Sequence, residues 1–155
     1  MERSELIVET IQLATENVKN GGGPFAAVIV KDGEIIATGI NQVTSTLDPT
    51  AHAEVVAIRA ACRALGNFEL TGCEIYCSCE PCPMCLGAIY WSRPARVFFA
   101  ATARAAADAG FDDSFIKEQI RLPFSRQQLP IQQLVHASAL APFEAWKAKG
   151  NKIAY

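Results

Sequence analysis

Apolar residues near the amino terminus recur at helical spacing, at Ile7, Ile11, Ala14 and Val18. Residues that lie three and four positions apart share one face of an α-helix, so this spacing predicts an amphipathic helix. Three glycines and a proline follow at residues 21–24, where a helix does not continue. We therefore predict one amphipathic helix that ends before residue 21 and packs on the fold through this apolar face.

Short apolar runs further along the chain predict β-strands. The runs at residues 25–31 and 34–39 flank Asp32-Gly33, a dipeptide that tolerates the positive φ of a tight turn, so together they predict a hairpin. Similar runs predict strands at residues 74–79, 96–101 and 131–135.

Helices are predicted between these strands. Thr50 can cap a helix whose apolar positions run from Ala53 to Ala64. The next helix is predicted to start at Pro81 or Cys82, because proline suits a first helical turn.

Two more helices are predicted toward the carboxyl terminus, at residues 114–120, which Asp112 and Asp113 can cap, and at 142–149, before Gly150. Strands that alternate with helices lie parallel, whereas the strands of a hairpin are antiparallel. The whole pattern predicts an α/β fold, a three-layer α/β/α sandwich on a five-stranded mixed sheet.

Composition adds the size and class of the protein. With 155 residues, of which 50% are hydrophobic and 19% charged, the chain fits a single domain, 1–155, whose core is stable without disulfides. The charged start from Met1 to Glu5 leads into the amphipathic segment without an apolar signal sequence or a membrane span. We expect a cytoplasmic protein with no membrane partner.

Charge bears on the kind of partner. The formal net charge is −2, and the nearest approach to a basic cluster is formed by Lys147, Lys149 and Lys152. A protein that binds a polynucleotide normally presents a basic stripe that neutralises phosphates. We therefore expect a small free substrate and no nucleic acid.

Two short motifs carry the chemistry, His-Ala-Glu at residues 52–54 and Pro-Cys-Pro-Met-Cys at residues 81–85. One imidazole and two thiolates bind Zn²⁺ and leave its fourth tetrahedral position to water, and a carboxylate beside them can transfer that water's protons. This pair of motifs is the known signature of zinc-dependent nucleobase deaminases. The predicted site comprises the metal ligands His52, Cys82 and Cys85 and the catalytic acid and base Glu54.

Both motifs lie at predicted helix starts. The free N–H groups of a helix N-terminus form a positive pole, which stabilises the Glu54 carboxylate and lowers the pKa of thiols such as those of Cys82 and Cys85. We expect the first turns of the two helices to converge on one zinc ion.

The motifs taken alone leave other roles open. Cys77, Cys79, Cys82 and Cys85 could hold a structural zinc, although that site would leave the His-Ala-Glu motif without a role. A thioredoxin-like redox pair at Cys82 and Cys85 has the same shortcoming. His52 could merely cap its helix. The crowding of thiols itself fits a reducing compartment better than a disulfide framework.

Over essentially its whole length the chain resembles the cytidine and deoxycytidylate deaminase superfamily. Within it the chain looks most like the bacterial guanine deaminases, whereas transfer RNA adenosine deaminases share the zinc motifs and lack the segment at 109–115 and the Lys-Ile-Ala-Tyr terminus. The residues that carry the resemblance are Gly-Gly-Pro-Phe at 22–25, Asn41, Pro-Thr-Ala-His-Ala-Glu at 49–54, Ser-Cys-Glu-Pro-Cys-Pro-Met-Cys at 78–85, Ala-Ile-Tyr-Trp at 88–91 and Ala-Gly-Phe-Asp-Asp-Ser-Phe at 109–115.

The resemblance implies hydrolysis of guanine to xanthine and ammonia, with one Zn²⁺ per subunit. Glu54 would deliver a water proton to the ring nitrogen beside C2, and Asp113 would move a proton toward the departing amino group. The resemblance also implies a domain-swapped homodimer, in which Tyr155 closes a substrate pocket. The implied substrate contacts are Phe25, Asn41, Ala53, Trp91, Asp113 and Tyr155.

Without the resemblance several of these residues have plainer roles. Asp113 could be a helix cap, Asn41 a turn residue, Phe25 and Trp91 core, and Tyr155 a disordered end. Other substrates also stay open: guanosine, a pterin, an amino-triazine or the wobble adenosine of transfer RNA. A zinc-stabilised interaction protein is the non-enzymatic alternative, although such a protein has no use for a carboxylate like that of Glu54.

Overall fold

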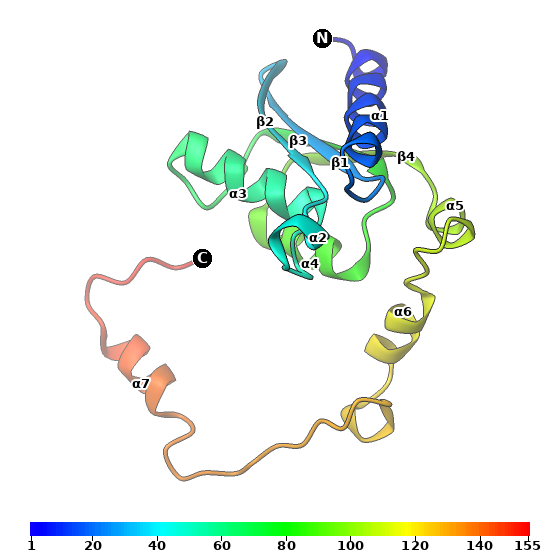
Figure 1. Ribbon diagram of the computed structural model, residues 1–155. Coiled ribbons are helices and arrows are strands. Elements are labelled where there is room, and N and C mark those ends of the chain that lie inside the picture. The colour runs from blue at the N-terminus through cyan, green and yellow to red at the C-terminus, as the bar shows by residue number, and fades with distance from the viewer. The chain divides into compact units, whose positions relative to one another are not determined.

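Strands run in the order β2-β1-β3-β4 across the sheet of this computed structural model, which describes residues 1–155 (Figure 1). β1 pairs antiparallel with both β2 and β3, and β3 pairs parallel with β4. The predicted mixed sheet is therefore confirmed. The strands are β1 (Ala26–Lys31), β2 (Glu34–Ile40), β3 (Cys73–Cys79) and β4 (Arg96–Ala101).

The prediction of a fifth strand was wrong, because the sheet has four strands. Residues 131–135 form an irregular segment, in which Leu134 and Val135 are 84% and 86% exposed. A strand exists only where its backbone groups find a paired neighbour, and residues 114–155 contain no other strand. An apolar run is therefore not sufficient for a strand here.

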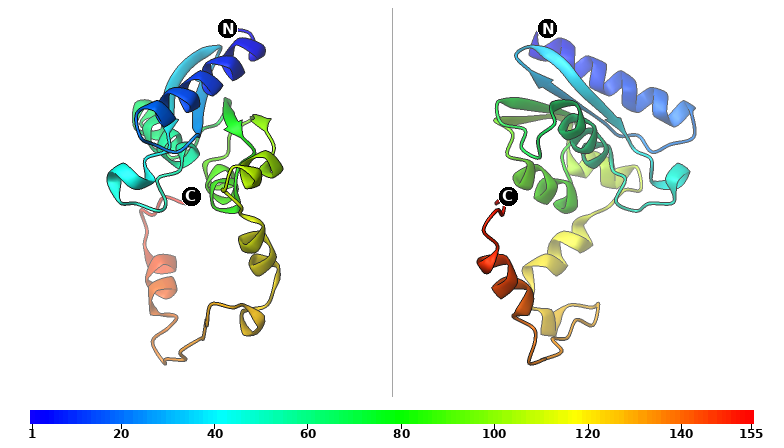
Figure 2. Two further views of the ribbon diagram at one scale, coloured as in Figure 1. Left: turned by 45° about the vertical axis from the view of Figure 1, so that its right-hand side comes forward. Right: turned by 90° about the vertical axis from the view of Figure 1, so that its left-hand side faces the viewer.

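The chain divides into two compact units, Met1–Asp113 and Ser114–Tyr155. In the first unit, α1 (Arg3–Lys19) covers one face of the sheet, and α3 (Ala53–Leu65) and α4 (Pro83–Ser92) cover the other (Figure 2). This is the predicted three-layer α/β/α arrangement.

Alternation along β1 builds the two cores. Ala27 and Ile29 belong to the cluster that packs against α3 and α4, whereas Val28 and Val30 pack with Leu6 of α1. Successive side chains of a strand point to opposite faces, so one apolar strand supplies both clusters. The same alternation in β3 directs Cys73, Ile75 and Cys77 toward α3 and α4.

Helix α1 confirms the first predicted helix but buries a different face. Its buried residues are Leu6, Thr10, Ala14 and Asn17, whereas Ile11 and Val18 are 41% and 49% exposed. Leu6 fixes this orientation, because it packs against the apolar residues of β1 and β3. Ile11 and Val18 line an open groove beside Ala100 and Ala101 of β4. The predicted apolar face was therefore only partly correct.

The turns and helix starts follow local chemistry. Asp32 and Gly33 have φ of 51° and 83°, as the predicted hairpin turn requires. Thr50 does not cap α3, because its hydroxyl donates to Asp48 at 2.7 Å and the N-cap is His52. Helix α4 starts at Pro83, one residue after the predicted Cys82, which is its N-cap. The turn α2 (Val43–Thr46) follows β2.

Helix α5 (Ala103–Asp108) was not predicted, although its signal is present in the sequence. Thr102 precedes an alanine-rich run, and its hydroxyl accepts a hydrogen bond from the backbone N–H of Ala105 at 3.3 Å. Threonine before a run of good helix formers is a standard helix start.

The second unit, Ser114–Tyr155, contains α6 (Ser114–Arg121), the 3-10 turn η1 (Phe124–Arg126) and α7 (Ala141–Ala148). The predicted helices at 114–120 and 142–149 are confirmed. No residue of this unit is buried. None of the helices of the protein is long and apolar enough to cross a membrane. The exposed large apolar side chains of this unit include Phe115, Ile116, Ile120, Phe124, Leu134, Val135, Phe143, Trp146 and Tyr155.

Candidate metal centre and active site

The starts of α3 and α4 converge on one point, as the sequence predicted. His52 and Cys82 are the N-cap residues of these helices, with extended backbones at φ of −67° and −68°. Glu54 and Cys85 lie in the corresponding first turns. An N-cap residue and the first turn after it surround the open end of a helix, where backbone N–H groups lack intrahelical partners. Two such ends therefore supply the three potential metal ligands and Glu54.

The ligand atoms are spaced for a tetrahedral metal. The Nδ1 atom of His52 lies 3.5 Å from the sulfur of Cys82 and 3.5 Å from that of Cys85. Tetrahedral Zn²⁺, with bonds of about 2.0 Å to nitrogen and about 2.3 Å to sulfur, places such atoms about 3.5 Å apart. All the ligand atoms lie within 4.8 Å of one another. One imidazole and two thiols therefore fit Zn²⁺ both in kind and in spacing.

Protonation of the ligands also favours a metal site. Hydrogen bonds from Cys85 and then from His52 lower the pKa of the Cys82 thiol to about 4. The hydrogen bond between His52 and Cys82 raises the pKa of His52. The hydrogen bond between Cys85 and Cys82 raises the pKa of Cys85. These hydrogen bonds favour the thiolate form of Cys82, which is the form that binds Zn²⁺.

Glu54 lies against the ligands without being one of them. Glu54 is 8% exposed, and its carboxylate accepts a hydrogen bond from the sulfur of Cys85 at 3.3 Å. Burial raises the pKa of Glu54 above its usual value. A carboxyl group whose pKa is raised toward neutrality can both accept and return a proton.

The structure separates the remaining thiols from the metal ligands. Cys77 and Cys79 lie in β3, and burial is the main cause that raises the pKa of each. The potential metal-binding group joins Cys82 and Cys85 to His52 instead. The four-cysteine alternative therefore finds no support in the geometry, and the His-Ala-Glu motif has a role that a redox pair would not give it.

Asn41 and Phe25 meet at the ends of β1 and β2. The backbone N–H of Asn41 donates to the carbonyl oxygen of Phe25 at 3.1 Å. The side-chain oxygen of Asn41 accepts from the N–H of Val43 at 3.2 Å. The ring of Phe25 makes an edge-to-face contact with Phe111, with centroids 5.0 Å apart. This contact joins the start of β1 to the segment before Asp113.

Asp113 ends the first unit and lies near the end of β3. Burial, followed by the charge of Glu54, raises the pKa of Cys79, and the charge of Asp113 adds to the rise. Cys79 thus lies within electrostatic range of both carboxylates that the sequence proposed as catalytic. The structure therefore brings Asp113 to the same end of the sheet as the metal ligands.

Glu80 was not proposed from the sequence, although it stands directly before the second motif. Its carboxylate accepts a hydrogen bond from the N–H of Ala103 at 2.7 Å, and its own N–H donates to Ala101 at 2.8 Å. The sulfur of Cys79 donates to the carbonyl of Thr102 at 3.6 Å. These contacts fix the start of α5, which leads to Asp113.

Other predicted substrate contacts differ in where they lie. Ala53 is fully buried as the first residue of α3. Trp91 is 66% exposed near the far end of α4, six positions after Cys85, or about 9 Å along a helix axis. Tyr155 ends the second unit. The structure does not bring Trp91 together with the metal ligands, so its role stays a prediction.

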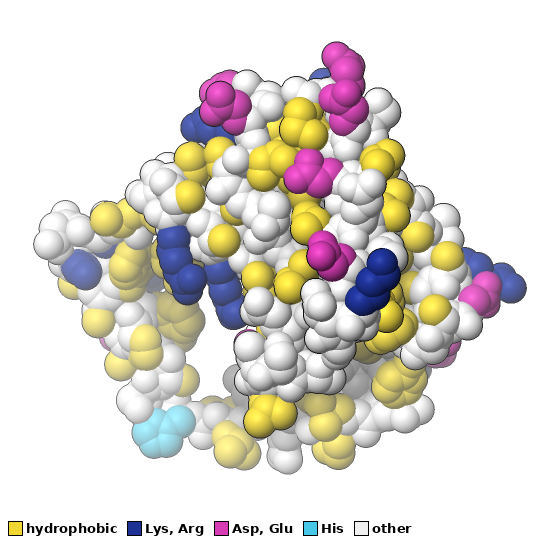
Figure 3. Space-filling view, turned by 45° about the horizontal axis from the view of Figure 1, so that its top comes forward, with side chains coloured by type: hydrophobic (Ala, Val, Ile, Leu, Met, Phe, Trp, Pro, Cys, Tyr) yellow, Lys and Arg dark blue, Asp and Glu magenta, His cyan; other side chains and the backbone are white.

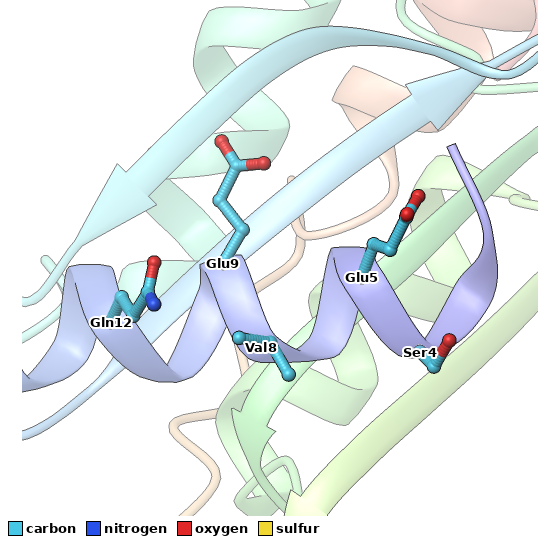
Figure 4. A pocket seen from close by; sticks show the side chains of 5 residues that line it. All are labelled: Ser4, Glu5, Val8, Glu9 and Gln12. Carbon is cyan, nitrogen blue, oxygen red and sulfur yellow. The ribbon is translucent and has the colours of Figure 1, made fainter.

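The outer surface of α1 has a shallow hollow, drawn in Figure 4. All of its lining side chains come from one helix, and α1 packs on the sheet face opposite to α3. The hollow is therefore separated from His52 by the sheet and holds none of the predicted site residues. Its lining residues are Ser4, Glu5, Val8, Glu9 and Gln12.

Comparison with known protein sequences also supports a zinc-binding site of the kind that the geometry indicates. The profile of the family described as "Cytidine and deoxycytidylate deaminase zinc-binding region" matches residues 1–101. The guanine deaminase of Bacillus subtilis (strain 168) is 54% identical over 156 residues, which cover 100% of both chains. A tRNA-specific adenosine deaminase of Aquifex aeolicus (strain VF5) is 49% identical over 83 residues, 54% of this chain and 55% of that protein.

Solved structures give the same result. The X-ray structure of the Bacillus subtilis guanine deaminase matches with a TM-score of 0.99 and covers 100% of this chain and 99% of that chain. The guanine deaminase from Nitrosomonas europaea matches with a TM-score of 0.70 at 32% identity, over 72% of this chain and 65% of that chain. The sequence, the fold and the residues at the starts of α3 and α4 agree: the chain belongs to the cytidine and deoxycytidylate deaminase family.

Proposed function

We propose that this protein is a guanine deaminase, which hydrolyses guanine to xanthine and ammonia. One observation carries the proposal: His52, Cys82 and Cys85 converge beside the unligated Glu54 in a chain that is 54% identical, over 100% of its length, to a guanine deaminase. The transfer RNA deaminase matches only 54% of the chain. Guanine is therefore favoured over the other amino-heterocycles.

The residues divide the chemistry between them. Zn²⁺ held by His52, Cys82 and Cys85 would supply a Lewis acid that makes water nucleophilic at neutral pH. Glu54 takes a proton from the attacking water and gives it to the ring nitrogen beside C2. Its buried position and raised pKa suit both steps, because a general base works best when its pKa lies near the working pH. We propose one zinc ion per subunit.

Asn41, Phe25 and Ala53 orient the base. The Asn41 amide can offer a donor and an acceptor to a purine edge. The Phe25 ring, held edge-to-face by Phe111, offers a planar apolar wall. Ala53 is small and buried at the helix start, so it leaves room for the ring beside Glu54. Trp91 completes the proposed contacts.

Asp113 assists departure of the amino group. It lies within electrostatic range of Cys79, which also feels the charge of Glu54. A second carboxylate at this end of the sheet can carry a proton to the amino nitrogen as the C–N bond at C2 breaks, so that the nitrogen leaves as ammonia. The same Asp113 also stands directly before α6, so its catalytic and capping roles are compatible.

We propose that the working form is a domain-swapped homodimer. None of the residues 114–155 is buried, and this unit exposes many large apolar side chains. A segment of that kind cannot offset its ordering entropy with a core of its own, so it needs a surface on which to pack. A second copy of the chain supplies that surface, and Tyr155 closes the partner's substrate pocket.

Charge supports a small substrate rather than a polynucleotide. In Figure 3, Lys and Arg side chains lie among acidic and apolar ones. The formal net charge is −2. Tight binding of a polynucleotide would call for a cluster of cations. We propose a free purine as the partner, with neither nucleic acid nor membrane.

Ammonia release tests this function directly. The zinc-loaded protein should release ammonia from guanine faster than from cytosine, adenine or guanosine. Turnover of another amino-heterocycle without turnover of guanine would refute the proposed substrate while retaining a deaminase. Tight transfer RNA binding with a steep salt dependence would favour the adenosine alternative.

A further inference from the structure

Asn17 is a buried polar residue that takes no part in the mechanism proposed above. It lies in the last turn of α1 and is 5% exposed. Its amide nitrogen donates to the carbonyl oxygen of Gly23 at 2.8 Å and to that of Asn41 at 3.0 Å. Burying an amide costs free energy unless it is hydrogen-bonded, and these two hydrogen bonds satisfy the buried amide nitrogen of Asn17. Both acceptors lie outside the helix, 6 and 24 residues along the chain.

One acceptor belongs to a proposed base-binding residue, Asn41, and the other lies in the loop that leads to a second one, Phe25. Asn41 is itself joined to Phe25 through its N–H at 3.1 Å. Gly23 lies two residues before Phe25 and is held by the same amide. One side chain thus fixes the strand end that carries Asn41 relative to the loop that carries Phe25.

The glycines of this loop are fitted to the two asparagines. A Cβ on Gly22 would lie 2.5 Å from the amide nitrogen of Asn17, and a Cβ on Gly23 would lie 3.1 Å from the Cγ of Asn41. Neither glycine has a positive φ. Close approach of the asparagine side chains, rather than backbone conformation, therefore explains the lack of side chains at both positions.

We infer that Asn17 is a positioning residue, which sets the place of Asn41 and Phe25 for binding of the purine. This inference rests on the proposed function, since it takes those two residues as contacts of the base. The hydrogen bonds of Asn17 go to the backbone of Asn41 and to that of Gly23, two residues before Phe25. Glu54 and the zinc ligands belong instead to the starts of α3 and α4. Loss of Asn17 should therefore weaken substrate binding more than it slows the chemical step.

The test compares Asn17→Ala and Asn17→Asp with Thr10→Ala in the zinc-loaded full-length protein. Thr10 is buried on the same helix face, and its hydroxyl bonds only within α1, to the carbonyl of Leu6. It therefore controls for a general loss of helix stability. Asn17→Asp keeps the shape of the side chain but cannot donate to the two carbonyls.

The expected result is a rise in KM for guanine of about tenfold or more in both Asn17 variants, with kcat changed by less than about threefold and zinc content unchanged. Thr10→Ala should leave KM within about twofold of the wild type. Gly23→Ala should also raise KM, because its methyl group would press on the side chain of Asn41. An unchanged KM in Asn17→Asp would overturn the inference, because packing alone would then explain the residue.

A second measurement does not depend on the substrate. Hydrogen exchange at the backbone N–H of Asn41 should become faster in both Asn17 variants and stay unchanged in Thr10→Ala. If the wild type does not turn over guanine, the proposed function fails, whereas the exchange rate still decides the role of Asn17. Unchanged exchange at Asn41 in both variants would refute positioning even in an active guanine deaminase.

Discussion

The backbone of Gly39 in β2 lies directly against Ala53 at the start of α3. A Cβ on Gly39 would lie 2.2 Å from the carbonyl oxygen of Ala53 and 2.5 Å from the backbone nitrogen of Ala57. Ala53 stands between His52 and Glu54. Because Gly39 has no side chain, the start of α3, which carries His52 and Glu54, can pack directly on β2.

Gly39→Ala should damage both the fold and the site. The new methyl group would meet backbone atoms, which cannot move aside as a side chain can, so α3 must shift. We expect the free energy of unfolding to fall by about 1–3 kcal/mol or more, with reduced zinc content. Chemical denaturation and metal analysis measure the two effects.

Gly87→Ala is the matched control in α4. A Cβ there would meet no atom within 4 Å, and the position is helical without a positive φ. Alanine should stabilise the helix by about 0.5–1 kcal/mol and leave zinc content unchanged. Equal behaviour of the two variants would mean that close approach at Gly39 does not matter.

Glu54→Gln should abolish turnover while zinc content and fold are retained. Glutamine has nearly the same shape as glutamate, but it cannot take a proton from water. We expect kcat to fall by at least about 100-fold, as for other general bases. Metal analysis and steady-state kinetics on one sample separate the two properties. Substantial remaining turnover would remove the proton-transfer role.

Cys82→Ala should lose the metal together with activity. The variant leaves two of the three clustered ligands, which is too few for a stable zinc site. Cys62→Ala is the control, since Cys62 packs beside the core cluster and lies outside the ligand group. The control should retain full zinc content after dialysis against a weak chelator. Full zinc retention by Cys82→Ala would contradict the assigned ligand set.

Glu80→Ala should lower kcat without loss of zinc. It removes the carboxylate that accepts from the N–H of Ala103, so α5 and the segment before Asp113 lose an anchor. Asp108→Ala is the control, because it removes an exposed carboxylate at the other end of α5. We expect kcat to fall about tenfold in Glu80→Ala only, about the effect of one lost hydrogen bond to a charged group. Equal kinetics of both variants would rule out an anchor at Glu80.

Removal of Tyr155 should impair turnover and leave zinc bound. If the C-terminal segment is exchanged, mixing this truncated chain with Glu54→Gln should restore activity, because a mixed dimer pairs an intact Glu54 with an intact Tyr155. Refolding the two chains together and assaying ammonia release measures the recovery. Full activity of the truncated chain alone would discard the capping role, and no recovery in the mixture would argue against the swap.

Local signals predicted the parts of the fold that local chemistry determines. Asp32-Gly33 marked the hairpin, and the proline beside Cys82 marked the start of α4. The run at 131–135 failed because a strand needs a paired neighbour that its own residues do not encode. The buried face of α1 also differed, since the apolar surface beneath Leu6 decides which side of the helix is covered.

The same distinction applies to the site. The metal ligands and Glu54 belong to motifs with strict spacing, so the sequence alone singled them out. Asn17 and Glu80 are defined by the backbone groups they contact, Asn41 and Ala103, which lie 24 and 23 residues away. No pattern of residue types marks such contacts in advance. A polar residue on the buried face of a predicted helix becomes informative only when that face is known.

The position of Cys77 and Cys79 in β3 has a consequence for how the protein acquires its metal. In the unfolded chain these thiols and those of Cys82 and Cys85 are close neighbours, whereas His52 is 30 residues from Cys82. Zinc that is present during refolding can therefore bind a rival all-thiol set and stabilise the wrong state. Pairing of β3 with its neighbouring strands removes Cys77 and Cys79 from that competition. Zinc added after refolding should thus give a higher yield of active protein than zinc added before it.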